Sequence, residues 1–153
     1  MRRISLFMVP AAIVGIASMA HTQSLSDLLP ADCSLVQGVI EASFTSETTL
    51  EGTVSGDLEG TLDTTVVDSV VIDDAIEVLF AESTITTADG SIETTDTIAL
   101  VSLGPVMDLW FGRHEITGGT GDFEGAFGGL KTFGLQFNGG PLNLQYFGAV
   151  CTD

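Results

Sequence analysis

Apolar and polar residues alternate with a period of two over most of the chain after residue 33, the pattern of strands with one buried face. Near the start of this region Val36, Ile40, Ala42 and Phe44 alternate with polar residues. Threonine and valine, both favoured in strands, are abundant, and no long stretch repeats with the period of a helix. The pattern therefore predicts an all-β chain.

Turn-forming residues divide this region into about eight strand segments. The clearest turns are Asp73–Asp74, Ala88–Gly90, Gly104–Pro105, Gly118–Asp122 and Asn138–Pro141. The spacing predicts a small closed antiparallel barrel of about eight strands, with a compact sandwich as the alternative. Such a barrel has room inside for side chains or one small ligand. An outer-membrane barrel fits poorly, because Glu, Asp and Thr are spread along nearly every strand.

The first residues have the features of a signal peptide. Arg2 and Arg3 precede a short apolar stretch, and Ser18–Ala20 supplies the small residues of a cleavage site. We expect residues 1–20 to be a signal peptide, 21–32 a flexible arm and 33–153 the barrel domain of a secreted or periplasmic protein. A retained anchor is the alternative, although the apolar stretch is shorter than the roughly 20 residues of a spanning helix.

Two cysteines, Cys33 and Cys151, stand near the two ends of the expected domain. In an oxidising compartment such a pair predicts a disulfide, which places the first and last strands side by side as barrel closure requires. A redox or metal-binding pair is the alternative, but no CxxC motif or histidine cluster accompanies them. We expect no metal and no cofactor.

The charge is strongly negative, with 21 Asp and Glu against four Lys and Arg and a net charge of −17. Removal of the signal peptide would leave Arg113 and Lys131 as the positive side chains. Nucleic acids and anionic membranes bind through Lys and Arg, so both are excluded as partners. The acids themselves are typical of a solvated surface.

One cluster of mixed ionisable residues, Arg113, His114 and Glu115, offers candidate chemistry. On a strand, His114 shares a face with Asp108 and Trp110, while Arg113 points to the other face. The catalytic candidates are His114, Asp108 and Arg113, with the histidine as acid or base near a cavity mouth. A surface histidine beside an Arg113–carboxylate pair is the alternative.

The last third of the chain carries a row of aromatic residues at alternate positions. If this face points inward, the wall of a ligand cavity consists of Phe123, Phe127, Phe133, Phe137 and Tyr146, with Trp110 beside it. Glycines lie opposite or between these rings, as close strand packing in a barrel requires.

The segment Ile116–Lys131, with the sequence ITGGTGDFEGAFGGLK, resembles the glycine-rich motif of plant allene oxide cyclases and, more loosely, of dirigent proteins. The segment Ser55–Leu58 is also similar to a cyclase segment. The resemblance implies an eight-stranded barrel, a homotrimer and a mostly apolar cavity that orients a small apolar or phenolic molecule and promotes its cyclisation. The catalytic residues of that family lie outside the matched segments.

Three hypotheses of function remain open: an isomerase or cyclase-type enzyme, a non-catalytic barrel that binds a lipophilic ligand, and a filled barrel that acts through its acidic surface or a trimer. Cavity volume discriminates between them. A pocket of about 300 Å³ or more with a few convergent polar groups favours the enzyme, and an all-apolar pocket of that size favours the binding protein. A filled interior favours the third hypothesis.

Overall fold

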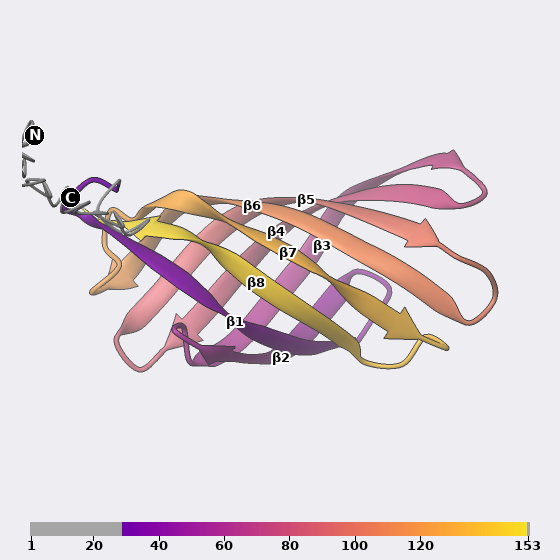
Figure 1. The fold of residues 1–153 in the computed structure, drawn as a ribbon, viewed down its shortest axis with the longest axis horizontal. Coiled ribbons are helices and arrows are strands. Elements are labelled where there is room, and N and C mark those ends of the chain that lie inside the picture. Colours follow the sequence, from indigo (N-terminus) through magenta and orange to yellow (C-terminus); the bar gives the residue numbers. More distant parts are fainter. Residues whose placement is uncertain (1–28, 153) are drawn as a thin grey trace, which may run out of the picture.

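The computed structural model describes residues 29–152, which form an eight-stranded antiparallel barrel with no helix in this part of the chain (Figure 1). No helix within the described residues is long and apolar enough to cross a membrane. The expected signal peptide, residues 1–20, and most of the arm, residues 21–32, lie outside the described residues. The strands are β1 Cys33–Phe44, β2 Thr49–Gly56, β3 Gly60–Asp73, β4 Ile76–Thr87, β5 Gly90–Ser102, β6 Met107–Gly121, β7 Phe127–Phe137 and β8 Leu142–Cys151.

Each strand pairs with the next along the chain, and β8 returns to pair with β1. The predicted all-β closed barrel is therefore confirmed. The predicted Ala88–Gly90 turn is also present, because β4 ends at Thr87 and β5 begins at Gly90. Closure satisfies the backbone groups that an open sheet would leave at its two edges.

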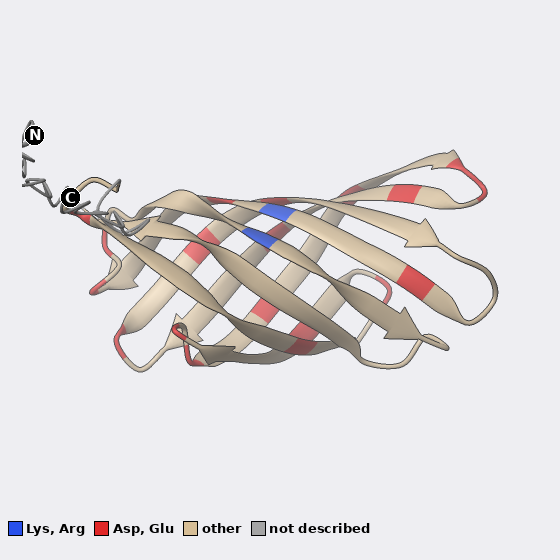
Figure 2. Cartoon of the chain, in the orientation of Figure 1, with Lys and Arg blue, Asp and Glu red and all other residues tan. Residues whose placement is uncertain are grey.

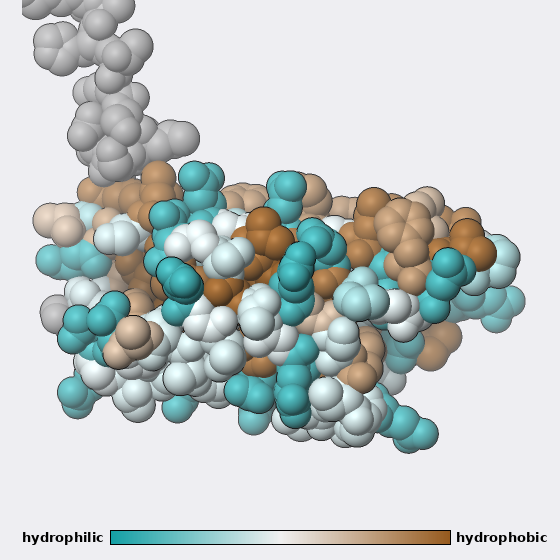
Figure 3. All heavy atoms as spheres, turned by 90° about the horizontal axis from the view of Figure 1, so that it is seen from below, coloured by the Kyte–Doolittle hydropathy of each residue, from teal (hydrophilic) through white to brown (hydrophobic). Residues whose placement is uncertain are grey.

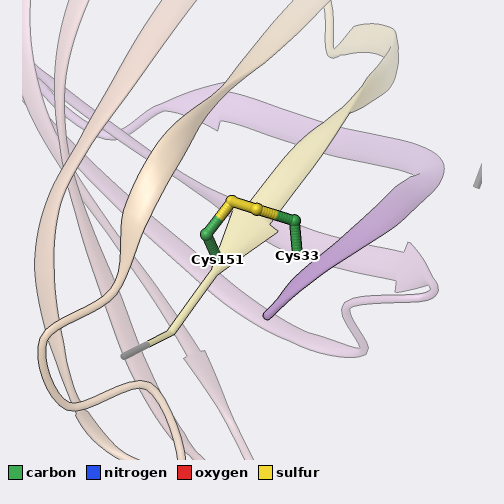
Figure 4. The surroundings of a disulfide bond; sticks show 2 residues. All are labelled: Cys33 and Cys151. Atoms are coloured by element: carbon green, nitrogen blue, oxygen red, sulfur yellow. A yellow bond between two sulfur atoms is a disulfide. The ribbon is translucent and has the colours of Figure 1, made fainter. Parts of the chain in front are cut away.

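The disulfide between Cys33 and Cys151 joins the strands that close the barrel (Figure 4). These two residues are direct partners in the β1–β8 register, and they are 118 positions apart in the sequence. The bond therefore ties the first strand to the last at one end of the barrel. It is compatible with an oxidising, extracellular environment.

The lumen is filled by the alternating side chains that face inward from all eight strands. Most are aliphatic, and they form a single buried core: Val36, Ile40, Leu50, Val54, Leu62, Leu79, Ile85, Ile92, Ile98, Trp110, Ile116, Leu130, Leu142, Leu144, Tyr146 and Val150. Burial of such side chains contributes roughly 1.5–3 kcal/mol each. The core is thus continuous along the length of the barrel.

The two ends of the barrel differ. At the disulfide end, Leu58 and Ala126 from the turns are buried and Phe123 packs against the core. At the opposite end the β3–β4 hairpin and the β5–β6 loop extend beyond the β1–β2 and β7–β8 turns (Figure 1), and Val70, Val71 and Ile72 of the hairpin are exposed. Hydrophobic side chains gather at this end and along the upper edge of the view in Figure 3. We call the disulfide end the closed end and the hairpin end the open end.

The face of β7 that points into the barrel is not the aromatic face that the sequence pattern offered as a cavity wall. The sequence pattern starts this strand at Phe123, but Phe123 lies in a turn, where its N–H donates to Thr120 and its carbonyl accepts from Ala126. The strand itself begins at Phe127, and Leu130, Thr132 and Gln136 are its buried residues. Phe127, Phe133 and Phe137 consequently point outward, each about half exposed.

Candidate functional site

A buried acid–base pair lies inside the barrel between β5 and β6. Asp96 and His114 are direct partners in the register of these strands, and both side chains face the lumen. The Asp96 Oδ1 atom lies 2.9 Å from His114 Nδ1. The carboxylate side chain is 0 % exposed and the imidazole 13 % exposed, so solvent screens their interaction only weakly.

Hydroxyl groups from three strands complete the surroundings of the Asp96 carboxylate. Thr94 Oγ1 donates to Oδ1 at 2.7 Å, and Ser83 Oγ donates to Oδ2. Thr64 Oγ1 in turn lies 2.7 Å from Ser83 Oγ. All three hydroxyl residues are buried. The buried carboxylate therefore has hydrogen-bond partners on both oxygens, which offsets the cost of removing it from water.

The other ring nitrogen of His114 extends the chain of hydrogen bonds to β7. Nε2 lies 2.9 Å from Thr132 Oγ1. An ionised carboxylate only accepts hydrogen bonds, so the neutral imidazole carries its proton on Nδ1 and Nε2 accepts from the Thr132 hydroxyl. Thr132, His114 and Asp96 thus form a hydroxyl–imidazole–carboxylate chain, in which the carboxylate fixes the orientation and tautomer of the imidazole.

Gly112 makes room for this chain. It lies between His114 and Trp110 on the inner face of β6 and opposite Thr132 in the β6–β7 register. A Cβ at this position would collide with Thr132 Oγ1 and His114 Nε2. A residue with a side chain would therefore push apart the two atoms that share the hydrogen bond.

An inner cavity adjoins the polar chain. Its polar side consists of His114, Thr132, Thr64, Ser83 and Thr94. The rest of its lining consists of the core residues Ile40, Leu50, Leu62, Ile85, Ile98, Trp110, Leu130 and Leu144. The cavity has a volume of about 30 Å³, room for about two water molecules. It is far smaller than the 300 Å³ that a whole organic ligand requires.

A larger cavity opens at the mouth of the barrel. Its volume is about 480 Å³, and it is lined by residues of the β1–β2 turn and the β3–β4 hairpin together with Leu79, Leu100, Trp110, Gln136 and Gly139. Trp110 lines both cavities. The ring of Phe44 packs against it at the mouth, with ring centroids 6.0 Å apart and planes at 47°.

Trp110 also has an unsatisfied polar atom. The indole is 4 % exposed, and its Nε1 has no hydrogen-bond partner within residues 29–152. A buried donor left in this state costs about 1–3 kcal/mol. A ligand that reached the indole and brought a hydrogen-bond acceptor would recover that free energy.

The candidate residues identified in the sequence do not all lie together in the structure. Trp110 and His114 lie in the lumen, as their shared face predicted, but Asp108 is not the partner of His114. Asp108 instead accepts a hydrogen bond from Ser102 Oγ at 2.6 Å near the open end. Arg113 points outward. Strand alternation places it on the opposite face from its neighbour His114.

The aromatic wall is also divided. Tyr146 is buried, but its hydroxyl accepts a hydrogen bond from Leu58 N–H at 2.9 Å, toward the closed end. Burial raises the pKa of this hydroxyl above its ordinary value, although the Leu58 N–H opposes the change. Phe127, Phe133 and Phe137 face outward and Phe123 packs at the closed end, so none of the four lines either lumen cavity.

Asp96 is the residue of the candidate site that the sequence alone did not single out. A signal for it exists in the alternation of β5, where Ile92, Thr94, Asp96 and Ile98 occupy successive inward positions. A single carboxylate in an otherwise apolar or hydroxyl-bearing row is a strong indication of a buried polar network. Its partner follows only from the register of β5 with β6.

No family model, curated protein or solved structure matches this chain.

Proposed function

We propose that the barrel binds a small, largely apolar or phenolic molecule through its open end and that His114, held by Asp96, transfers protons on it. The mouth provides the volume for the body of the molecule, and the inner cavity accommodates one small end group beside Thr132 and His114. Access past Trp110 requires the Phe44 and Trp110 rings to move. The indole N–H and the Thr132 hydroxyl are the donors available to a ligand oxygen.

The observation that carries this proposal is the buried Thr132–His114–Asp96 chain beside a cavity. Apolar residues of similar volume commonly serve stability as well as, or better than, buried ionisable pairs. A histidine–carboxylate pair at a cavity is a pattern enriched at sites of proton transfer. Most side chains of the surrounding core are apolar, so the residues of this hydrogen-bond chain are a specific polar feature of the interior.

The arrangement suits an isomerisation. The His114 Nε2 atom would take a proton from a carbon next to a carbonyl, while the Thr132 hydroxyl turns to donate to the carbonyl oxygen. Asp96 would stabilise the imidazolium that forms, and His114 would return the proton to another carbon of the same molecule. The double bond moves and atoms balance, so the product is an isomer of the substrate.

This reaction class agrees with the isomerase or cyclase activity implied by the resemblance to allene oxide cyclases and dirigent proteins. In both cases the barrel orients a reactive molecule and excludes water from it. The disulfide supports the further proposal that the protein is exported through a cleaved signal peptide and works in a secreted or periplasmic location.

A non-catalytic carrier of a lipophilic molecule is the second candidate. The mouth cavity of about 480 Å³, with Phe44, Leu79 and Leu100 in its lining, favours it. In this case the polar chain would only hold a ligand oxygen, and no proton would be exchanged with carbon.

Two measurements test and separate the candidates. Trp110 is the single tryptophan of the chain, so its fluorescence reports directly on the mouth. Addition of the uncharged probe N-phenylnaphthylamine should change this fluorescence saturably, and an absence of binding would contradict both candidates. A β,γ-unsaturated cyclohexenone in heavy water should then gain deuterium with the native protein but not with His114→Gln. Equal deuterium incorporation in the two proteins, with probe binding intact, would favour the carrier.

A further inference from the structure

The two positive side chains of the described barrel lie side by side on its outer surface. Arg113 on β6 and Lys131 on β7 are direct partners in the register, and Figure 2 shows them as adjacent blue segments among scattered acids. Like charges directly opposite each other destabilise a sheet. Among residues 29–152 the ion pair within salt-bridge distance is that of Asp96 and His114, so neither Arg113 nor Lys131 is paired with a carboxylate in this part of the chain. The positions of the two cations are therefore not explained by internal pairing.

Exposed aromatic rings on β6, β7 and β8 neighbour these cations. Phe147 on β8 is the register partner of Lys131, and Phe111 on β6 is the partner of Phe133 on β7, one step along the same outer face. The rings of Phe111, Phe133 and Phe147 are 48 %, 44 % and 49 % exposed. We call Arg113, Lys131, Phe111, Phe133 and Phe147 the aromatic–cationic face. Exposed apolar groups gathered in this way commonly mark a binding surface.

A groove runs beside the two cations. It has a volume of about 240 Å³, and Gly128 and Gly129 line it together with Arg113, Lys131 and Glu115. On the outer face Gly129 pairs with Ala149 of β8, so the side chains beyond the groove are also small. Glu115 is the acidic group of the groove. The site thus combines two cations, one acid, a shallow channel and neighbouring aromatic rings.

We propose that the aromatic–cationic face binds a free anionic amphiphile, with its acid group between Arg113 and Lys131 and its apolar body against the phenylalanines. Paired cations suit a carboxylate, sulfonate or phosphate, and the rings suit an aromatic or aliphatic tail. A net charge of −17 opposes approach to an anionic bilayer, whereas one small anion meets chiefly the local cations. A two-fold dimer centred on this face would bring four cations together, which disfavours a second copy of the chain.

The test compares two probes that differ by one acid group. Anilinonaphthalene sulfonate carries the anion, and N-phenylnaphthylamine is its uncharged counterpart. The Arg113→Gln/Lys131→Gln variant should bind the sulfonate roughly fivefold more weakly, the size expected for two partly exposed charge contacts, while binding of the uncharged probe stays the same. High salt screens the two cations and should therefore narrow the difference in sulfonate affinity between the native protein and the variant. Lys131→Arg keeps the charge and should retain the affinity.

Other results would overturn the proposal. Equal sulfonate affinity in the native protein and the double variant would show that the cations form no anion site. Flotation with phosphatidylglycerol vesicles that depends on the two cations would identify a membrane surface instead of a free amphiphile. A native oligomer that dissociates in the double variant would identify a second copy as the occupant. Circular dichroism of each variant verifies that the barrel is folded.

Discussion

Asp96 and His114 face each other directly across β5 and β6, with the carboxylate Oδ1 2.9 Å from the imidazole Nδ1 inside a largely apolar barrel. This placement makes one pair the centre of a hydrogen-bond chain that includes residues of β3, β4, β5, β6 and β7. Loss of either partner would leave the remaining polar groups in the core without their principal contact.

The first prediction concerns the contribution of this pair to stability. Asp96→Ala should lower the free energy of unfolding by about 3 kcal/mol, because it leaves the imidazole and two hydroxyls buried with fewer partners. Urea unfolding followed by circular dichroism measures the change. Glu82→Gln, an exposed acid on β4, is the control and should change stability by less than about 0.5 kcal/mol. Equal effects from both substitutions would contradict the buried network.

The second prediction concerns Gly112. Gly112→Ala should lower stability by about 1–3 kcal/mol, because the added methyl group meets the Thr132–His114 hydrogen bond. Thermal unfolding measures this loss. Gly118→Ala provides a matched control on the same strand, since a Cβ there meets only Glu93 at 3.9 Å. Equal stability of the two variants would show that the space at Gly112 is not needed.

The third prediction concerns the Cys33–Cys151 disulfide. Because it closes a loop of 118 positions, its removal should cost up to about 5 kcal/mol through the greater freedom of the unfolded chain. The Cys33→Ser/Cys151→Ser variant and the reduced native protein should lose similar amounts in urea unfolding. A native protein unaffected by reductant, with both thiols then labelled, would contradict this role.

The fourth prediction follows from the raised pKa of Tyr146, the single tyrosine of the chain. The unfolded chain releases the phenolic proton at a lower pH than the folded protein, so stability is complete below about pH 10 and falls as pH rises through the folded pKa. Phenolate absorbance should therefore appear at higher pH in the folded protein than in urea. Coincident titrations would contradict the burial of the hydroxyl beside Leu58.

Much of the fold follows from local sequence signals. The alternation after residue 33 predicts strands, the turn at Ala88–Gly90 predicts a hairpin, and the cysteines near both ends predict contact between the first and last strands. Each of these signals depends on residues close in the sequence or on a covalent bond. The structure confirms all three.

The site was less accessible to such reasoning. The inward face of β7 depends on its register with β6, which pairs Leu130 and Thr132 with the inward positions of His114 and Gly112 and leaves the phenylalanines on the outer face. The partner of His114 depends on the register of β5 and β6, which also contains a bulge between Glu93 and Thr94. Alternation identified His114 and Trp110 as sharing a face, but it contains no information on which acid lies across from them.

Nitrogen NMR of the His114 imidazole tests the central arrangement most directly. At about pH 9, above the ordinary range of histidine titration, the buried pair predicts a single tautomer with the proton on Nδ1 in the native protein. Asp96→Asn should abolish this preference, while the exposed control Glu82→Gln should keep it. A native spectrum with two rapidly exchanging tautomers, as in a solvent-exposed histidine, would contradict the buried Asp96–His114 pair and the chemistry proposed for it.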